Sequence, residues 1–390
     1  MTERDSEENA NPAVSGSRVL KFGEGRISGY LSALFGICAL LGVLCFIFPE
    51  WLTTKELRAT LYSFSFVKNL LWLGIVIAFV TGIISYILSP RKRLAATGIG
   101  TALVAVLLGA FNVQERAVAD VPFSFGVDWF VLSLVFSMAI FIPLEKAFAR
   151  HPLAVLRPEW RTDLTYFVVS HLAITFFLLF TNAVQVYVFG WAHSAAVTEF
   201  AQSLPVWLQF LACVFIADLC QALTHRWYHQ VPWLWKFHSI HHSSRNMDWL
   251  AGSRTHFVEA LATRSAVIVP LYVINFSEPA LNAYVVLVGV QAVFVHANVR
   301  WDFGFLEYLI VTPRYHHWHH SDDPEYANTN YAVHLPLVDM LMGTFRLPDK
   351  TWPDTYGVFG QEPPKGFLPQ LAYPFVSTPR RESADDGSLS

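Results

Sequence analysis

Histidines gather in three short clusters within this 390-residue chain. The clusters are His225-Arg-Trp-Tyr-His229, His238-Ser-Ile-His241-His242 and His316-His317-Trp-His319-His320. Residues three and four apart lie on one face of a helix, so each cluster directs two or three imidazoles the same way. Protonated imidazoles packed together would repel one another, and buried neutral ones would lose hydration, whereas a bound metal cation removes both costs. The spacing therefore predicts a metal site.

The size of the set indicates two ions. The three clusters and His296, which lies in the same part of the chain, together have ten imidazoles. One of them, His317, is expected to be a filler that faces solvent or phosphate, which leaves nine. Nine nitrogens exceed what one metal can hold, whereas two ions that take about four or five each would use them. Imidazole suits zinc, copper, iron and nickel, and structural zinc usually closes with four ligands. A site with open positions favours a redox-active pair, and iron is the natural choice.

The chain around these clusters is strongly apolar. Hydrophobic residues make up 54% of it and charged residues 15%, against roughly 45–50% and 25% in soluble domains. Most of its long charge-free stretches reach the roughly 17–25 residues that cross a bilayer. They are 27–49, 69–89, 94–114, 129–144, 164–198, 200–217 and 279–299, with a weaker one at 265–277 that is long enough only if it begins nearer residue 260. We therefore expect an all-α integral membrane bundle of seven or eight spans.

The basic residues predict which side of the membrane holds the histidines. Short cytoplasmic loops carry an excess of Lys and Arg. If the spans alternate, residues 18–26, 91–93 and 146–161 fall on one side with the histidine clusters, whereas the opposite loop 193–205 has no Lys or Arg. Both termini and the metal site are therefore expected on the cytoplasmic side of a multi-pass protein.

Composition along the chain predicts four regions. Residues 1–25 are polar and acidic and are expected to be a disordered tail. Residues 26–150 are expected to form an N-terminal transmembrane module without histidine, followed by a histidine-rich catalytic or binding half and, at 351–390, a C-terminal cap segment and tail. Hydropathy drops after residue 299, so 300–376 is expected to cover the membrane domain as a cytosolic cap. The four cysteines all lie in apolar stretches, which predicts neither a disulfide nor a thiolate metal site.

Several polar residues are candidates to orient the imidazoles, because a ligating imidazole usually donates its other N–H to such a group. Asp218 and Gln221 precede His225 by seven and four residues and share its helical face. A carboxylate within an apolar segment is costly unless it is paired. The other candidates are His256, Glu259, Asn298, Asn330 and Asp339.

With these clusters, the sequence resembles the fatty acid hydroxylase/sterol desaturase superfamily of membrane di-iron enzymes. The resemblance covers roughly residues 155–350 and rests on segments 225–229, 235–244, 254–259, 296–299, 312–321 and 330–345. It implies a helical bundle whose cytosolic cap holds two irons, which with dioxygen hydroxylate or desaturate a lipid. No catalytic residue is implied beyond the iron ligands, which by motif are His225, His229, His238, His241, His242, His296, His316, His319 and His320.

The expected chemistry needs partners. Breaking an unactivated C–H bond is beyond side-chain acids and bases, and the sequence has no flavin, haem or nicotinamide fingerprint. Electrons are therefore expected from a separate carrier, such as a small haem protein, a ferredoxin or a similar reductase system. The expected substrate is a membrane lipid, a sterol or a fatty acyl chain, and no nucleic acid is expected to bind. Two alternatives stay open: a metal-ion transporter with histidines lining the membrane interior, and a b-type cytochrome.

Overall fold

A computed structural model describes residues 21–62, 65–114 and 123–376. Within these ranges all regular structure is helical, apart from two isolated backbone bridges that pair Ala149 with Val299 and Ser321 with Tyr356. This confirms the predicted all-α class. The tail predicted at 1–25 and the one predicted within 351–390 lie mostly outside the described residues.

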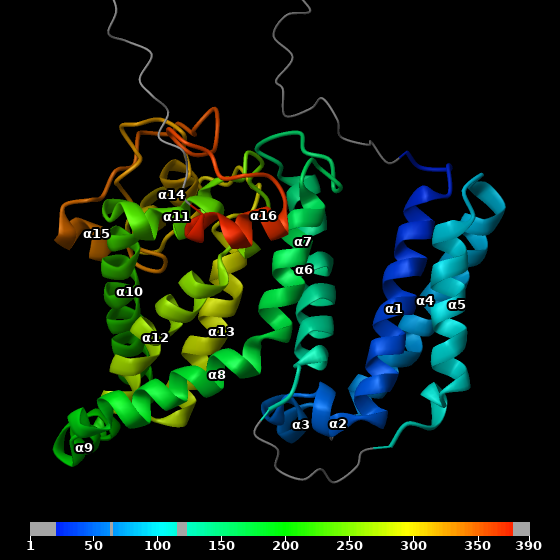
Figure 1. Ribbon diagram of the computed structural model, residues 1–390, viewed down its shortest axis with the longest axis horizontal. Helices are drawn as coiled ribbons and strands as arrows, with labels where there is room; N and C mark the ends of the chain where they lie inside the picture. Colours follow the sequence, from blue (N-terminus) through cyan, green and yellow to red (C-terminus); the bar gives the residue numbers. More distant parts are fainter. Residues whose placement is uncertain (1–20, 63–64, 115–122, 377–390) are drawn as a thin grey trace, which may run out of the picture.

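The N-terminal module packs around one central helix. α1 (Arg26–Ile47) lies against α4 (Ser65–Leu88) and α5 (Arg93–Leu107), as Figure 1 shows on the blue and cyan side of the molecule. Glycine permits the close approach of α1 and α5, because a Cβ on Gly98 would come within 2.1 Å of Ser32 Oγ. Two short helices, α2 (Pro49–Leu52) and α3 (Lys55–Thr60), follow α1 at its far end.

The histidine-bearing half consists of longer helices with a cap of short helices at one end (Figure 1). Apart from the cap, this half contains α7 (Trp160–Leu172), α8 (Ile174–Ala183), α9 (Ala195–Ser203), α10 (Val206–Gln230), α12 (Phe257–Ile274) and α13 (Glu278–Phe294). α6 (Val127–Ala147) lies between the two parts and packs against α1 and α7. The cap helices are α11 (Pro232–His242), α14 (Pro313–His319), α15 (Pro336–Met342) and α16 (Phe367–Ala372). Three of the four cap helices begin with proline at the first turn, where no intrahelical N–H bond is lost.

Within the part of the chain that the structure describes, five helices are long and apolar enough to cross a membrane: α1, α4, α6, α10 and α12. A sixth span is possible if α7 and residues Ile174–Val188 count as one, although they meet at an angle of 52°. The stretches predicted at 94–114 and 279–299 are the shorter helices α5 and α13, of 15 and 17 residues. The predicted count of seven or eight therefore depends on whether these two also cross, and it stays a prediction. The weak stretch at 265–277 begins earlier, at Phe257, and forms a full-length span.

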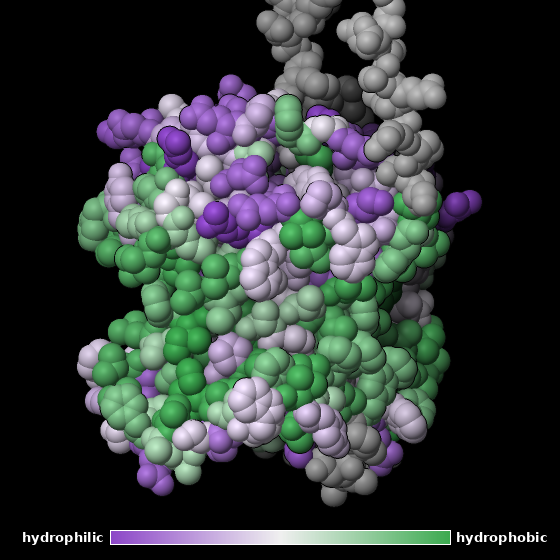
Figure 2. Space-filling view, turned by 60° about the vertical axis from the view of Figure 1, so that its left-hand side comes forward, coloured by the Kyte–Doolittle hydropathy of each residue, from purple (hydrophilic) through white to green (hydrophobic). Residues whose placement is uncertain are grey.

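The surface of the molecule has the pattern expected of a membrane protein. Figure 2 shows a hydrophobic belt between two hydrophilic ends, the larger of which is the cap. On α4, for example, Val76, Val80 and Ile83 are each at least half exposed. The candidate spans and this belt together indicate that the chain is a multi-pass membrane protein. That the cap faces the cytoplasm stays a prediction.

A buried ion-pair cluster joins the start of α7 to the loop that follows α11. Arg157 pairs with Asp163 and Asp248 at 2.7 Å, and Arg254 pairs with Asp163 at 2.5 Å and Glu159 at 3.0 Å. Both guanidinium groups are 1% exposed. Buried charges are tolerated when each has an opposite partner, so this cluster fixes the loop that carries Arg254.

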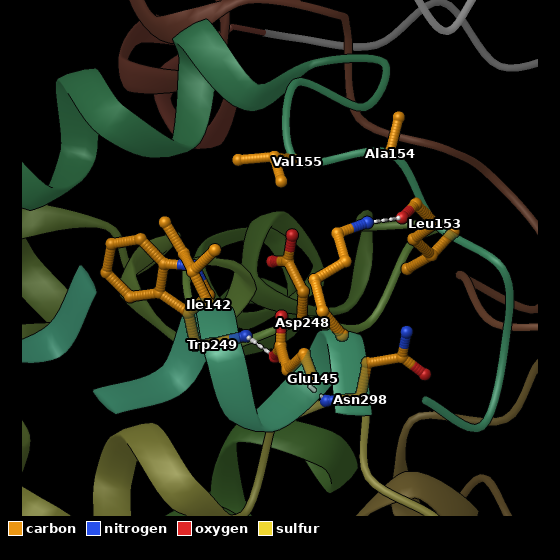
Figure 3. A pocket seen from close by; sticks show the side chains of 9 residues that line it. Ile142, Glu145, Leu153, Ala154, Val155, Asp248, Trp249 and Asn298 are labelled. Atoms are coloured by element: carbon orange, nitrogen blue, oxygen red, sulfur yellow. Dashed lines mark hydrogen bonds between the residues drawn. The ribbon is translucent and has the colours of Figure 1, made fainter. Parts of the chain in front are cut away.

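α6 is tied to the same region by a single carboxylate. Glu145 accepts hydrogen bonds from the backbone N–H groups of Trp249, at 2.7 Å, and Asn298, at 2.9 Å. Figure 3 shows these two bonds in a pocket that Asp248 and Lys146 also line. The last helix before residue 150 therefore holds two loops of the histidine-bearing half.

Candidate metal centre

Four segments bring the histidine side chains to the cap end of the bundle. α10 continues unbroken past its apolar part and carries His225 and His229. α11 carries His238, His241 and His242, while His296 follows the end of α13. α14, which begins at Pro313 after the capping residue Thr312, carries the third cluster.

The nine predicted histidines meet in two groups. The nitrogens available for ligation lie within 4.8 Å of one another in each group: a five-histidine group, His225, His229, His238, His242 and His319, and a four-histidine group, His241, His296, His316 and His320. Eight of the nine rings are buried, and His229 is half-buried. Histidines adjacent in the sequence can belong to different groups, as His241 and His242 do. The structure thus joins all nine predicted residues, and their role as ligands stays a proposal.

The hydrogen bonds of the five-histidine group leave nitrogen lone pairs facing one another. His225 Nδ1 lies 2.8 Å from the Tyr331 carbonyl and His238 Nδ1 lies 2.6 Å from Glu259 Oε1. A carbonyl oxygen can only accept, and so can a carboxylate when it is ionised, so each Nδ1 beside them carries the ring's proton and each Nε2 a lone pair. These two Nε2 atoms are 2.9 Å apart. Such an arrangement is repulsive without a cation.

The four-histidine group repeats this arrangement. His241 Nδ1 donates to the Arg254 carbonyl at 3.1 Å and His296 Nδ1 to the Ala292 carbonyl at 2.9 Å, and their Nε2 atoms face each other at 3.3 Å. A third ring of the five-histidine group follows the same pattern. His319 Nδ1 donates to the Thr329 carbonyl at 2.8 Å, and its buried Nε2 has no hydrogen-bond partner. The donor sets therefore fit two imidazole-binding cations, one in each group.

Burial favours the neutral form of the seven clustered histidines that lie outside the candidate spans. Burial, with further lowering by neighbouring imidazoles, holds the pKa of six of them well below the usual value: His238, His241, His242, His316, His319 and His320. Burial also lowers the pKa of His296 to about 4. Neutral imidazole is the form that binds metals, so the rings are held ready for ligation.

Two of the polar residues proposed to orient the rings are connected to them in different ways. Glu259 contacts the ring of His238 directly. Asp339 acts through the backbone: its carboxylate accepts from the N–H groups of Tyr331, at 2.9 Å, and Ala332, at 2.6 Å. This contact fixes the Tyr331 carbonyl to which His225 donates.

Asp218 and Gln221 do not contact the His225 ring as the helical spacing predicted. Asp218 shares the face of His225, but it accepts hydrogen bonds from the backbone N–H groups of residues 333–335 at 2.7 to 3.1 Å. Among the described residues Gln221 makes no hydrogen bond to a histidine. The buried carboxylate of Asp218 therefore binds the backbone of residues 333–335 rather than the ring.

Three further candidates brace the cap. His256 caps α12 by accepting from the Val258 N–H at 3.1 Å and lies outside both histidine groups. The Asn298 side chain bonds to the backbone of His151 at 2.8 and 2.9 Å. Asn330 adopts a left-handed conformation, with φ of 59°, and its side chain bonds to the backbone of Arg346 at 2.6 and 2.8 Å. None of these three residues contacts a ring of the two groups.

The prediction that His317 faces solvent was wrong. His317 is fully buried, and its ring contacts the Tyr356 hydroxyl at 2.9 Å and the His296 carbonyl at 3.3 Å. The segment that begins near residue 351 folds over α14 and supplies Tyr356. His317 therefore links the cap segment to the backbone of His296.

Replacing Asp339 by alanine is expected to destabilise the protein. The carboxylate also accepts from the Tyr315 hydroxyl at 2.7 Å and the Thr344 hydroxyl at 2.6 Å, so alanine leaves four buried donors without an acceptor. We expect a loss of about 3–5 kcal/mol in the free energy of unfolding, measured by denaturant titration in detergent. Asp349→Ala, at an exposed position, is the control, and equal stability of the two variants would contradict the assignment.

Comparison with known proteins agrees with the geometry. The fatty acid hydroxylase family matches residues 210–344, which include all nine histidines. The ornithine lipid hydroxylase OlsE of Rhizobium tropici is 33% identical over 178 residues, 46% of this chain and 54% of that protein. The alkylglycerol monooxygenases of Xenopus tropicalis and Homo sapiens are 28% identical over 144 residues and 30% identical over 122, which is 37% and 31% of this chain.

The chain spans about half the length of the first relative and 31% and 27% of the two monooxygenases. No solved structure matches the chain. The matched region coincides with the helices and loops that form the two histidine groups. The chain therefore carries a fatty acid hydroxylase domain and belongs, through that domain, to the fatty acid hydroxylase/sterol desaturase superfamily.

Proposed function

We propose that this protein is a membrane-bound di-iron oxygenase that hydroxylates a lipid, with dioxygen as co-substrate. The observation that carries the proposal is the pair of buried histidine groups in which imidazole lone pairs face one another. Two bound irons would supply the redox chemistry that breaking an unactivated C–H bond requires. Imidazole ligands suit iron.

The protein's own residues hold the site in one arrangement. The five-histidine group would bind one iron and the four-histidine group the other. Glu259 and the carbonyls of Tyr331, Arg254 and Ala292 accept hydrogen bonds from the Nδ1–H groups of four histidines. These bonds direct the Nε2 lone pairs of the same rings inward. Burial of the rings keeps bulk water away from the reacting atoms.

A lipid substrate follows from the position of the groups at the end of the membrane helices. The relatives that match are named for hydroxylation of ornithine lipid and oxygenation of alkylglycerol, which favours hydroxylation over desaturation and an acyl or alkyl lipid over a sterol. Electrons would come from a separate carrier, a small haem protein, ferredoxin or similar reductase, because the sequence has no flavin or nicotinamide fingerprint.

The position of the groups does not favour a transporter. Histidines that pass a metal across the membrane would line its interior, whereas these lie on the last turns of α10 and on the cap helices α11 and α14 (Figure 1). A b-type cytochrome would need two facing histidines on separate spans. Of the nine, only His225 and His229 lie within a candidate span, and both belong to α10.

Comparative lipid mass spectrometry tests the proposal. Cells that produce the full-length protein are expected to contain a lipid heavier by one oxygen atom than its counterpart in cells without it. A lipid that has instead lost two hydrogens would replace hydroxylation by desaturation. Identical lipid profiles, in cells where the protein carries its iron, would refute the oxygenase.

A further inference from the structure

One arginine inside a membrane helix has no protein partner. Arg264 lies in α12, and its buried Nη1 nitrogen has no hydrogen-bond acceptor. Among the described residues Arg264 makes no ion pair, and its guanidinium carbon lies 4.4 Å from the centroid of the Phe177 ring on α8. The face of one aromatic ring attracts the charge, but it does not satisfy the five N–H donors of a guanidinium.

The buried arginines among the described residues show what this position lacks. Arg157 and Arg254 each pair with two carboxylates, and Arg314 pairs with Glu307. Each of these lies outside the candidate spans. Arg264 is half-buried and lies near the middle of a candidate span without such a carboxylate, and an ionisable residue within a membrane span normally marks a functional site.

The residue before Arg264 is linked to the five-histidine group through one tyrosine. That residue, Thr263, bonds to the Tyr228 hydroxyl at 3.0 Å, and the ring of Tyr228 stacks on His238 with centroids 5.6 Å apart. Successive helix residues are turned by about 100°, so Arg264 faces α8 rather than the histidines. Helical side chains point back toward the N-terminal end, which here is the cap end of α12.

The seam between α8 and α12 is apolar and open to the membrane. Phe177 packs on Phe257 of α12 with centroids 4.9 Å apart. Phe176 and Phe180 on α8 are each 41% exposed, and Val258 on α12 is 39% exposed. A lipid chain can therefore lie along this seam, with the Arg264 guanidinium at its inner side.

We propose that Arg264 binds the anionic group of the lipid substrate, a carboxylate or a phosphate, at the seam between α8 and α12. The proposal rests on the proposed lipid oxygenase and narrows its substrate to acidic lipids. The planar guanidinium matches both anions through paired hydrogen bonds. An anion at this position supplies the missing partner of Arg264 and holds the attached chain next to the five-histidine group.

Photo-crosslinking of the full-length protein in phosphatidylcholine nanodiscs tests the proposal. The probes are a diazirine-bearing long-chain fatty acid, the alkyl phosphate and the alcohol of the same chain. We expect the acid or the phosphate to label the protein at least about tenfold more efficiently than the alcohol, and these two arms tell the two anions apart. In Arg264→Gln that preference should vanish, and in Arg264→Lys part of it should remain.

Controls separate this proposal from the proposed function. Arg245→Gln removes an exposed arginine of the cap, paired only with Glu362, and should keep the full preference. Iron content is measured on every sample, so a failure of the metal centre is seen independently of probe binding. Equal labelling of the wild-type protein by all three probes would overturn the anion site, as would an undiminished preference in Arg264→Gln.

Discussion

Replacing His241 and His242 together by alanine is expected to remove the bound iron and abolish product formation. These neighbours on α11 belong to different groups, His241 to the four-histidine group and His242 to the five-histidine group. One double variant therefore takes a ligand from each proposed iron. Loss of a single orienting contact typically costs 10–100-fold in metal affinity, so we expect loss of two ligands to lower turnover by more than about 100-fold.

The single variants show whether the two groups act as separate sites. His241→Ala is expected to release the iron of the four-histidine group and His242→Ala that of the five-histidine group, each leaving more iron bound than the double variant. His193→Ala, a histidine in the loop before α9, is the control. Full activity in the double variant would refute the ligand assignment.

Replacing Glu259 by alanine is expected to weaken iron binding by about 10–100-fold. Glu259 accepts the Nδ1 proton of His238, whose Nε2 lies within 3.1 Å of two other cluster nitrogens. Without the carboxylate the ring is free to turn or to change tautomer, so its lone pair no longer points into the group. The measurement is iron retained against a competing chelator, which reports on the site whether or not a substrate is known.

Two matched variants sharpen the Glu259 experiment. Glu259→Gln keeps an oxygen that can accept the hydrogen bond from His238 Nδ1–H, so this variant should retain more iron than Glu259→Ala. Glu278→Ala removes an exposed carboxylate at the start of α13 and should behave as the wild-type protein. If Glu259→Ala holds iron as tightly as Glu278→Ala, the carboxylate does not orient His238.

The sequence predicted that the histidine clusters converge, because residues three and four apart share one face of a helix. His225 and His229 on α10, like His238 and His242 on α11, are one turn apart and enter the same group. The separation of His241 from His242 was not predicted, since it depends on how α11 lies between α10 and the His296 segment. The carbonyls that orient the rings carry no sequence signal, because every residue has one.

Asp218 shows where helical periodicity stops being informative. The spacing places it correctly on the face of His225, and both side chains contact the segment that begins at Tyr331. The distance along the helix, however, brings the carboxylate to the N–H groups of residues 333–335 rather than to the ring. Helical spacing therefore predicts the direction in which a side chain points. Its hydrogen-bond partner depends on which distant segment of the chain packs nearby.

The membrane helices show a similar limit. Hydropathy located every long apolar helix, but it treated residues 164–198 as one stretch, whereas the chain bends by 52° between α7 and α8. It also placed the start of the weak stretch at residue 265, or nearer residue 260 if it crosses, whereas α12 begins at Phe257 and places Arg264 within a helix long enough to cross. A lone arginine between two apolar runs was the available signal for the proposed anion site.

Iron analysis of the purified full-length protein after anaerobic loading with ferrous ion tests the central claim most directly. The two histidine groups predict two iron ions per chain, with a clearly lower ratio in the His241→Ala, His242→Ala double variant. A wild-type protein that binds clearly fewer than two irons per chain after such loading would contradict the di-iron site.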